Sequence, residues 1–207
     1  MANKLSKSDV VAACIHGIEL AQEKYLEWSG EWLWRAPEYY TTVSIVQEID
    51  KQTGSKFITL ENNAKSALDE AGAKGPGKLH SAIRGNGRVD ILLWWKNGKP
   101  RAPLEVKRQV LKLRTIKSDL TRISEMINHR NKDSSLEFGA VAFYASCEKD
   151  STFPAGKKLD QSLDNLRQDA EKLVGKKSGV EMIRGATHET GDGAWAAAVM
   201  LLTPLRD

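Results

Sequence analysis

The stretch GRVDILLWWKNGKPRAPLEVK, residues 87–107, is the part of the chain that decides its expected fold. Two apolar segments, RVDILLWW and LEVKRQVLKL, are joined by KNGKPRAP, whose Asn-Gly pair is a strong signal for a hairpin turn. Apolar residues dominate the first segment and alternate with polar residues in the second, as they do in buried or half-buried strands. The sequence therefore predicts a β-hairpin with strands at 88–95 and 104–113.

The segments on either side of this hairpin predict helices that alternate with further strands. Apolar residues at helical spacing predict helices at 9–27, 37–52, 61–72, 118–131 and 159–174, and short apolar runs predict strands at 56–60, 138–146 and 194–202. Ser118 is the expected N-cap of its helix. This order predicts an α/β fold in which helices flank a mixed central β-sheet, within a single domain spanning 1–207.

The composition is that of an ordinary globular protein. The chain has 207 residues, of which 41% are hydrophobic and 28% charged, so it is long enough for one well-packed domain and unlike a disordered chain. No apolar run approaches the roughly 18–20 residues that span a bilayer, and the first residues lack a secretory signal. We therefore expect a soluble, cytoplasmic protein without a membrane partner.

Positive charge is concentrated in one part of the chain. The net charge is +4, but the stretch 96–122 alone holds nine Lys or Arg residues against two acids, Glu105 and Asp119. The local surplus exceeds that of the whole chain, so the remainder is slightly acidic. This distribution predicts a local basic face, which permits a nucleic-acid partner.

Two acids and a lysine stand out within the hairpin. Asp90 lies inside VDILL, and Glu105 and Lys107 lie inside LEVK, which is the one acid-x-Lys triplet of the chain. Charges among aliphatic residues are costly to bury unless they are paired or bind a metal. Residues i and i+2 of a strand share a face, and Asp90 lies on the strand expected to pair with theirs. Carboxylates brought together in this way suit Mg²⁺ or Mn²⁺.

These residues resemble the PD-(D/E)xK nuclease superfamily, which includes many restriction endonucleases. The matching elements are GRVDI at 87–91 and LEVK at 104–107, with Val89 where proline often stands. The resemblance extends over roughly 37–145. It implies a restriction-endonuclease-like core there, an N-terminal helical extension at 1–36, and a C-terminal helix and strand at 146–207 that complete the sheet.

The resemblance also implies a reaction and a site. The reaction is hydrolysis of phosphodiester bonds in DNA, and the enzyme is an endonuclease of restriction, phage defence or repair. Asp90, Glu105 and the carbonyl of Val106 would hold the Mg²⁺ or Mn²⁺, while Lys107 would orient the attacking water or stabilise developing charge. Many relatives use a further acid on the helix before the sheet, for which Glu38 is the first candidate and Glu48 the second. Gln109, on the expected face of Glu105, also reaches the site.

Contacts with DNA are expected from four basic residues near the hairpin, namely Arg88, Arg108, Lys112 and Arg122. Two other interpretations of the sequence compete with that of a nuclease. The first is a non-catalytic nucleic-acid-binding module on the same fold, or a subunit active only in a larger complex. The second is a structural or interaction domain in which Glu105 and Lys107 form an ion pair. The form of the substrate stays open, as does oligomeric state, although cleavage of both strands of a duplex favours a homodimer.

Overall fold

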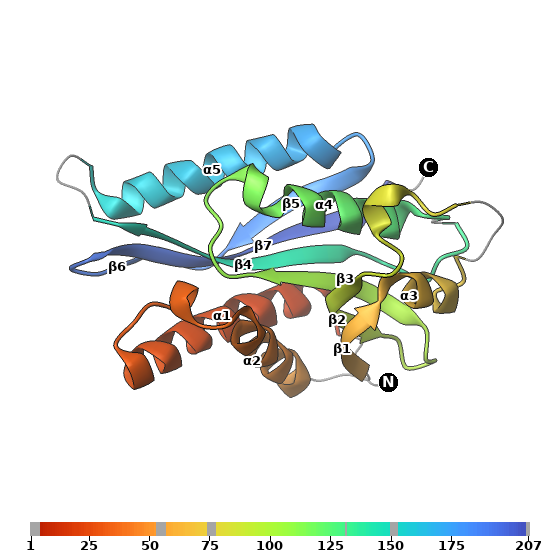
Figure 1. The fold of residues 1–207 in the computed structure, drawn as a ribbon, viewed down its shortest axis with the longest axis horizontal. Helices are drawn as coiled ribbons and strands as arrows, with labels where there is room; N and C mark the ends of the chain where they lie inside the picture. Colours follow the sequence, from red (N-terminus) through yellow and green to blue (C-terminus); the bar gives the residue numbers. More distant parts are fainter. Residues whose placement is uncertain (1–4, 53–56, 74–77, 131, 150–152, 206–207) are drawn as a thin grey trace.

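The protein has an α/β fold in which helices cover both faces of a mixed seven-stranded sheet (Figure 1). The computed structural model describes residues 5–52, 57–73, 78–130, 132–149 and 153–205. The expected fold class is thus confirmed. Among the described residues, no helix is long and apolar enough to cross a membrane.

The sheet has the strand order β1-β2-β3-β4-β7-β5, with β6 alongside β7. The strands are β1 (Phe57–Asn63), β2 (Arg88–Trp94), β3 (Pro100–Lys107), β4 (Gly139–Glu148), β5 (Ser178–Arg184), β6 (His188–Glu189) and β7 (Gly193–Pro204). Strands β3 and β4 run parallel, and the other described pairings are antiparallel. A parallel pair needs a crossover connection, which is supplied here by a helix on one face of the sheet.

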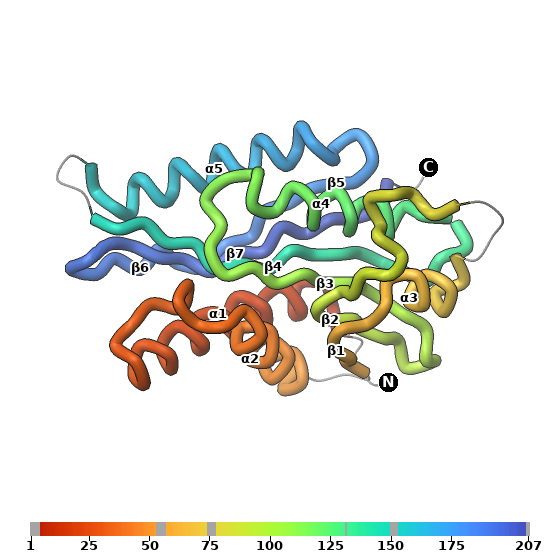
Figure 2. Tube along the Cα trace, viewed as in Figure 1, coloured from red at the N-terminus to blue at the C-terminus, as the bar shows by residue number. Residues whose placement is uncertain are grey.

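Two helices cover each face of the sheet. The helices are α1 (Lys7–Ser29), α2 (Glu38–Lys51), α3 (Ala64–Glu70), α4 (Leu113–Asn128) and α5 (Ala155–Val174), with short 3₁₀ turns at Leu33–Arg35 and Ser81–Ile83. Helices α1 and α2 lie below the sheet in Figure 1, whereas α4 and α5 lie above it. Figure 2 traces the chain from the end of β3 through α4 and back into β4.

Strand β4 shows how the two faces are filled. Tyr144 belongs to the apolar cluster formed with α1 and α2, whereas its neighbour Phe143 belongs to the cluster formed with α4 and α5. Successive side chains of a strand point to opposite faces, so a strand covered on both faces reads as a continuous apolar run. The end of β3 lies between these two helical layers, and it carries the residues singled out in the sequence.

The expected hairpin is present, but its second strand is shorter than predicted. Strand β3 ends at Lys107, and α4 begins at Leu113 rather than at Ser118. The apolar alternation that predicted a strand to residue 113 has another cause. Val110 is buried against the α4–α5 layer and its N–H donates to the carbonyl of Tyr144 while the chain turns away from the sheet.

Other elements also differ from the prediction, among them α5, which begins at Ala155 rather than at 159. Strand β1 continues to Asn63, whose side chain accepts a hydrogen bond from the N–H of Ser66 and so caps α3. Strands β5 and β6 were not predicted, although Val180 and Met182 alternate with the exposed Glu181 as in a strand. Residues 56 and 131, predicted ends of a strand and a helix, lie outside the described residues.

Helices α1 and α2 approach so closely at Gly17 that a side chain does not fit there. A Cβ atom on Gly17 would lie 2.7 Å from the Cα of Ile45. We expect Gly17→Ala to lower the free energy of unfolding by about 1–3 kcal/mol, although alanine favours helix, because the two backbones must separate. Thermal unfolding measures the change. The matched control Gly191→Ala should be neutral, because no atom lies within 4 Å of its Cβ position. Equal stability of both variants would contradict this prediction.

Candidate functional site

The antiparallel register of β2 and β3 brings two carboxylates to opposing positions. Ile91 pairs with Leu104, and the same register continued by one residue places Asp90 opposite Glu105. Directly opposed residues of an antiparallel pair project from the same face of the sheet. Glu105 points toward α4, because its carboxylate meets Arg122 of that helix. The two acids therefore share the α4 side, at the end of β3.

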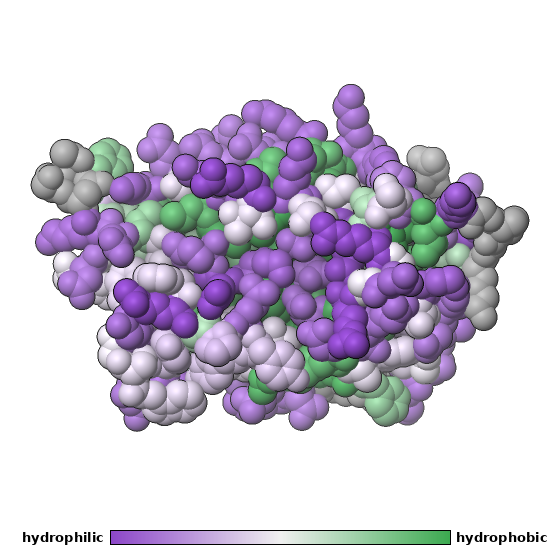
Figure 3. Space-filling view, viewed as in Figure 1, coloured by the Kyte–Doolittle hydropathy of each residue, from purple (hydrophilic) through white to green (hydrophobic). Residues whose placement is uncertain are grey.

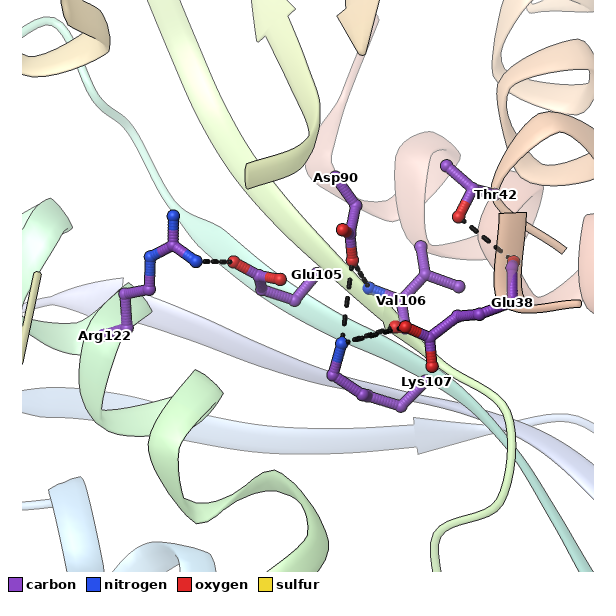
Figure 4. Close-up of polar contacts among 7 residues, drawn as sticks. All are labelled: Glu38, Thr42, Asp90, Glu105, Val106, Lys107 and Arg122. Atoms are coloured by element: carbon purple, nitrogen blue, oxygen red, sulfur yellow. Dashed lines mark hydrogen bonds and ion pairs between the residues drawn. The ribbon is translucent and has the colours of Figure 1, made fainter. Parts of the chain in front are cut away.

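Lys107 is the centre of this site (Figure 4). Its ammonium donates hydrogen bonds to the carbonyl of Val106 at 2.9 Å and to Oε1 of Glu38 at 3.2 Å, and it lies 3.8 Å from Oδ2 of Asp90. Burial acts to lower the pKa of Lys107, but the surrounding carboxylates, Asp90 foremost, outweigh it and raise that pKa. Lys107 is therefore a firmly charged ammonium that is surrounded by oxygen atoms from three chain segments.

Asp90 is held in a fixed orientation by the neighbouring strand. Its Oδ2 accepts a hydrogen bond of 2.7 Å from the backbone N–H of Val106. This contact ties the carboxylate of β2 to the strand that carries Glu105 and Lys107. A hydrogen bond of this type to a carboxylate is charge-assisted and stronger than one between neutral groups. Asp90 is therefore positioned by the fold itself.

Glu105 is the most deeply buried acid of the site, with an exposed fraction of 3%. Burial and the nearby Asp90 raise its pKa to about 8, despite opposing effects of Arg122 and Lys107. Oε1 lies 3.0 Å from Nη1 of Arg122, but without hydrogen-bond geometry, so among the described residues this oxygen has no hydrogen-bond partner. The ion pair therefore compensates the buried carboxylate only in part, because Oε1 accepts no hydrogen bond from the described residues.

Glu38 reaches the site from the other helical layer. It is the first residue of α2, after Pro37, where a carboxylate is stabilised by the positive end of the helix dipole. Glu48, the second candidate, lies ten residues further along α2 and is buried beside Lys51 and His16. Of the two candidate helix acids, the structure brings Glu38 to Lys107.

Gln109 does not lie on the strand face of Glu105, and that expectation is wrong. Strand β3 ends two residues earlier, and the loop that follows turns the Gln109 side chain toward β4. Its amide donates to the carbonyl of Ser146 at 3.0 Å and accepts from the Ser146 hydroxyl at 3.0 Å. These bonds fasten the loop after β3 to the end of β4, which is a structural role.

The four basic residues expected to contact DNA fall into two groups. Arg88, Arg108 and Lys112 are exposed, and Arg108 donates to the carbonyl of Ala36 at 2.7 Å. Arg122 is buried against Glu105, so the expected surface position of this residue is wrong. Figure 3 shows hydrophilic side chains across the middle of this face, between the α4 layer and the α1–α2 layer.

Asp119 is a site residue that the sequence did not single out. It lies on α4 one helical turn before Arg122, and its exposed fraction is 9%. Burial raises its pKa, against an opposing effect of Lys107, and its charge also interacts with that of Asp90. From the sequence, Asp119 counted only as one of two acids in the basic stretch. The structure places it on the inner face of α4.

The oxygen atoms of this site fit a divalent cation of the Mg²⁺ type. Asp90, Glu105 and the carbonyl of Val106 are hard oxygen ligands, and Oε1 of Glu105 is buried without a hydrogen-bond partner among the described residues. No three His, Cys, Asp or Glu side chains of the described segments gather closely enough to hold a metal by themselves. Water and a substrate phosphate would have to complete the coordination, which is usual for Mg²⁺.

Comparisons of the chain with family models, with curated proteins and with solved structures returned no match. The resemblance to PD-(D/E)xK nucleases therefore stays a prediction from residues 87–91 and 104–107. The geometry around Lys107 is the observation on which a functional conclusion depends.

Proposed function

We propose that the protein is a metal-dependent nuclease that hydrolyses phosphodiester bonds in DNA. The observation that carries this proposal is the oxygen environment of Lys107, whose ammonium lies among Asp90, Glu38 and the Val106 carbonyl. The ammonium of Lys107 therefore already occupies a position that is surrounded by oxygen atoms. The resemblance to PD-(D/E)xK nucleases assigns Asp90 and Val106 to the metal together with Glu105, and it makes Glu38 the first candidate for a further acid.

Each residue has a role in this reaction that its position supports. Asp90, Glu105 and the carbonyl of Val106 would hold Mg²⁺ or Mn²⁺, which supplies Lewis acidity and lowers the pKa of water. Asp90 needs little reorganisation, because the N–H of Val106 already fixes it. Lys107 orients the attacking water or stabilises charge on the phosphate, and Glu38 holds the ammonium of Lys107 in place.

The surroundings of the site suit a polyanion. Arg88, Arg108 and Lys112 are exposed near the ends of β2 and β3 and at the start of α4. Exposed Arg and Lys side chains bind the phosphate backbone without regard to sequence, and such binding weakens with salt. The proposed substrate is therefore DNA held mainly through its backbone. Restriction, phage defence and repair are the processes that nucleases of the resembling superfamily serve.

A non-catalytic nucleic-acid-binding module is the second candidate. Its specific support is the pairing of Glu105 with Arg122, which gives the most buried carboxylate a cationic partner without any metal. This alternative includes a subunit that becomes active only in a larger complex. It predicts DNA binding that weakens with salt but is indifferent to EDTA and to the loss of the Lys107 charge.

The test is cleavage of supercoiled and linear DNA by the purified protein with Mg²⁺, Mn²⁺ or EDTA. We expect nicking that needs the metal and stops with EDTA. Because metal binding needs the Glu105 carboxylate, whose pKa is about 8, subsaturating Mg²⁺ should support faster cleavage at about pH 9 than at about pH 7. Cleavage of circular DNA identifies an endonuclease. DNA binding without metal dependence or cleavage would favour the second candidate.

A further inference from the structure

Asp119 carries a largely buried carboxylate on the inner side of α4. Its exposed fraction is 9%, and it forms no hydrogen bond or ion pair through its side chain with the residues that the structure describes. A charged group in such a position costs free energy unless something compensates it. The proposed roles of Asp90, Glu105 and Lys107 leave Asp119 unexplained.

The side chain of Asp119 lies on the face of α4 that looks onto the site. Arg122, one turn later on the same face, contacts Glu105, whereas Leu120 and Ile123 belong to the apolar cluster shared with α5. The charge of Asp119 interacts with those of Lys107 and Asp90. Asp119 thus shares with Arg122 the face of α4 that is turned toward Glu105.

Mg²⁺ in proteins usually keeps several of its water molecules, and these waters need hydrogen-bond acceptors. We propose that Asp119 is a positioning residue of the metal site, whose carboxylate accepts hydrogen bonds from water bound to the cation that Asp90 and Glu105 hold. This inference rests on the proposed function. It accounts for a largely buried carboxylate beside a set of oxygen ligands that two acids and a carbonyl do not complete.

A purely structural role makes different predictions. In that case Asp119 attracts the nearby cations Arg84, Arg122 and Lys107 and keeps them in place. Its replacement would then lower the stability of the metal-free protein and leave the affinity for Mg²⁺ unchanged. Metal affinity and metal-free stability therefore distinguish the two roles.

The experiment measures Mg²⁺ binding by calorimetry on protein stripped with EDTA, and thermal unfolding of the same samples without metal. Asparagine keeps an acceptor oxygen but loses the charge that strengthens its hydrogen bonds, so for Asp119→Asn we expect Mg²⁺ affinity to fall by about tenfold or more. The metal-free unfolding temperature should not fall, because burial disfavours the charged form of this side chain. Asp164→Asn on the exposed face of α5 is the matched control and should bind Mg²⁺ as the unchanged protein does.

Asp119→Glu separates the position of the carboxylate from its charge. It keeps the charge but displaces the carboxylate by one methylene, so we expect weaker Mg²⁺ binding here too. Full affinity in this variant would show that charge alone matters and would overturn the water-holding role. Full affinity in Asp119→Asn would overturn it as well, while the proposed function survives. If the unchanged protein binds neither Mg²⁺ nor Mn²⁺, the proposed function itself fails. Asp119→Ser replaces Asp119→Asn if the latter does not fold.

Discussion

The Asp90→Asn variant is expected to lose metal-dependent DNA cleavage and metal binding while it keeps its fold. Asparagine retains the shape of aspartate but is neutral, so the proposed metal site would lose one of its two carboxylate ligands. We expect the cleavage rate to fall on the order of a thousandfold or more, because the metal supplies several kcal/mol of transition-state stabilisation. Affinity for Mg²⁺ should fall by at least about a hundredfold.

The fold should tolerate this substitution for two reasons. The amide oxygen of asparagine is still able to accept the hydrogen bond that the N–H of Val106 now donates to Asp90. The charge of Asp90 also raises the pKa of the buried Glu105, so its removal relieves a repulsion within the site. Loss of activity would therefore report on the chemistry of the site. Unfolding monitored by circular dichroism checks that the variant is folded.

The matched control for this variant is again Asp164→Asn, which makes the same chemical change on the exposed face of α5. Calorimetry with Mg²⁺ and single-turnover cleavage of plasmid DNA are run on both variants. An Asp90→Asn protein that still cuts DNA at the original rate would remove Asp90 from the mechanism. In that case the contact with Val106 would be its sole role, and the resemblance at 87–91 would carry no catalytic meaning.

The residues of the hairpin were predictable because local rules fix their arrangement. An Asn-Gly turn sets two strands side by side, and a separation of two residues places Glu105 and Lys107 on one face. Neither inference needs knowledge of distant segments. Glu38 differs, because it lies 69 positions from Lys107 in the chain. It was expected from the resemblance and not from any local pattern.

The errors arose where a local pattern had two physical solutions. Apolar residues alternate after Lys107 whether the chain continues as a strand or turns while burying Val110, and the second solution is the real one. Because the strand was predicted to continue to residue 113, Gln109 was assigned to the wrong face and the start of α4 was predicted too late in the chain. Asp119 was not singled out, because its place over the end of β3 depends on how α4 packs on the sheet.

The burial of Arg122 shows a different limit of sequence reasoning. A charged residue beside the apolar stripe of an amphipathic helix is usually solvated, and this default placed Arg122 on a DNA-binding surface. Its actual environment is set by Glu105, a buried acid on another element, across a tertiary contact. The pair forms only because α4 packs over β3, which no local pattern of the sequence encodes. Part of the positive charge counted in 96–122 is thus internal. The same holds for Arg101, which lies in this stretch and is paired with Glu137.

The Lys107→Met variant is expected to separate catalysis from metal binding. Methionine has a similar length but no charge, so the water or phosphate at the site loses its ammonium. We expect the single-turnover rate of DNA cleavage at saturating Mg²⁺ to fall by about a hundredfold to a thousandfold, the usual effect of removing one such electrostatic contact. Affinity for Mg²⁺ should increase, because the ammonium now lies near Asp90 and donates to the carbonyl of Val106.

Opposite changes in these two quantities would be hard to obtain from a structural role of Lys107. A purely structural ion pair with Glu38 predicts a lower unfolding temperature and an unchanged cleavage rate. Lys117→Met, on the exposed surface of α4, makes the same chemical change away from the site and should alter neither quantity. If Lys107→Met cuts DNA at the rate of the unchanged protein, the ammonium has no part in the reaction. If that activity still needed the metal, it would depend on Asp90 and Glu105 without the lysine. The acid-x-Lys pattern would then not describe the mechanism.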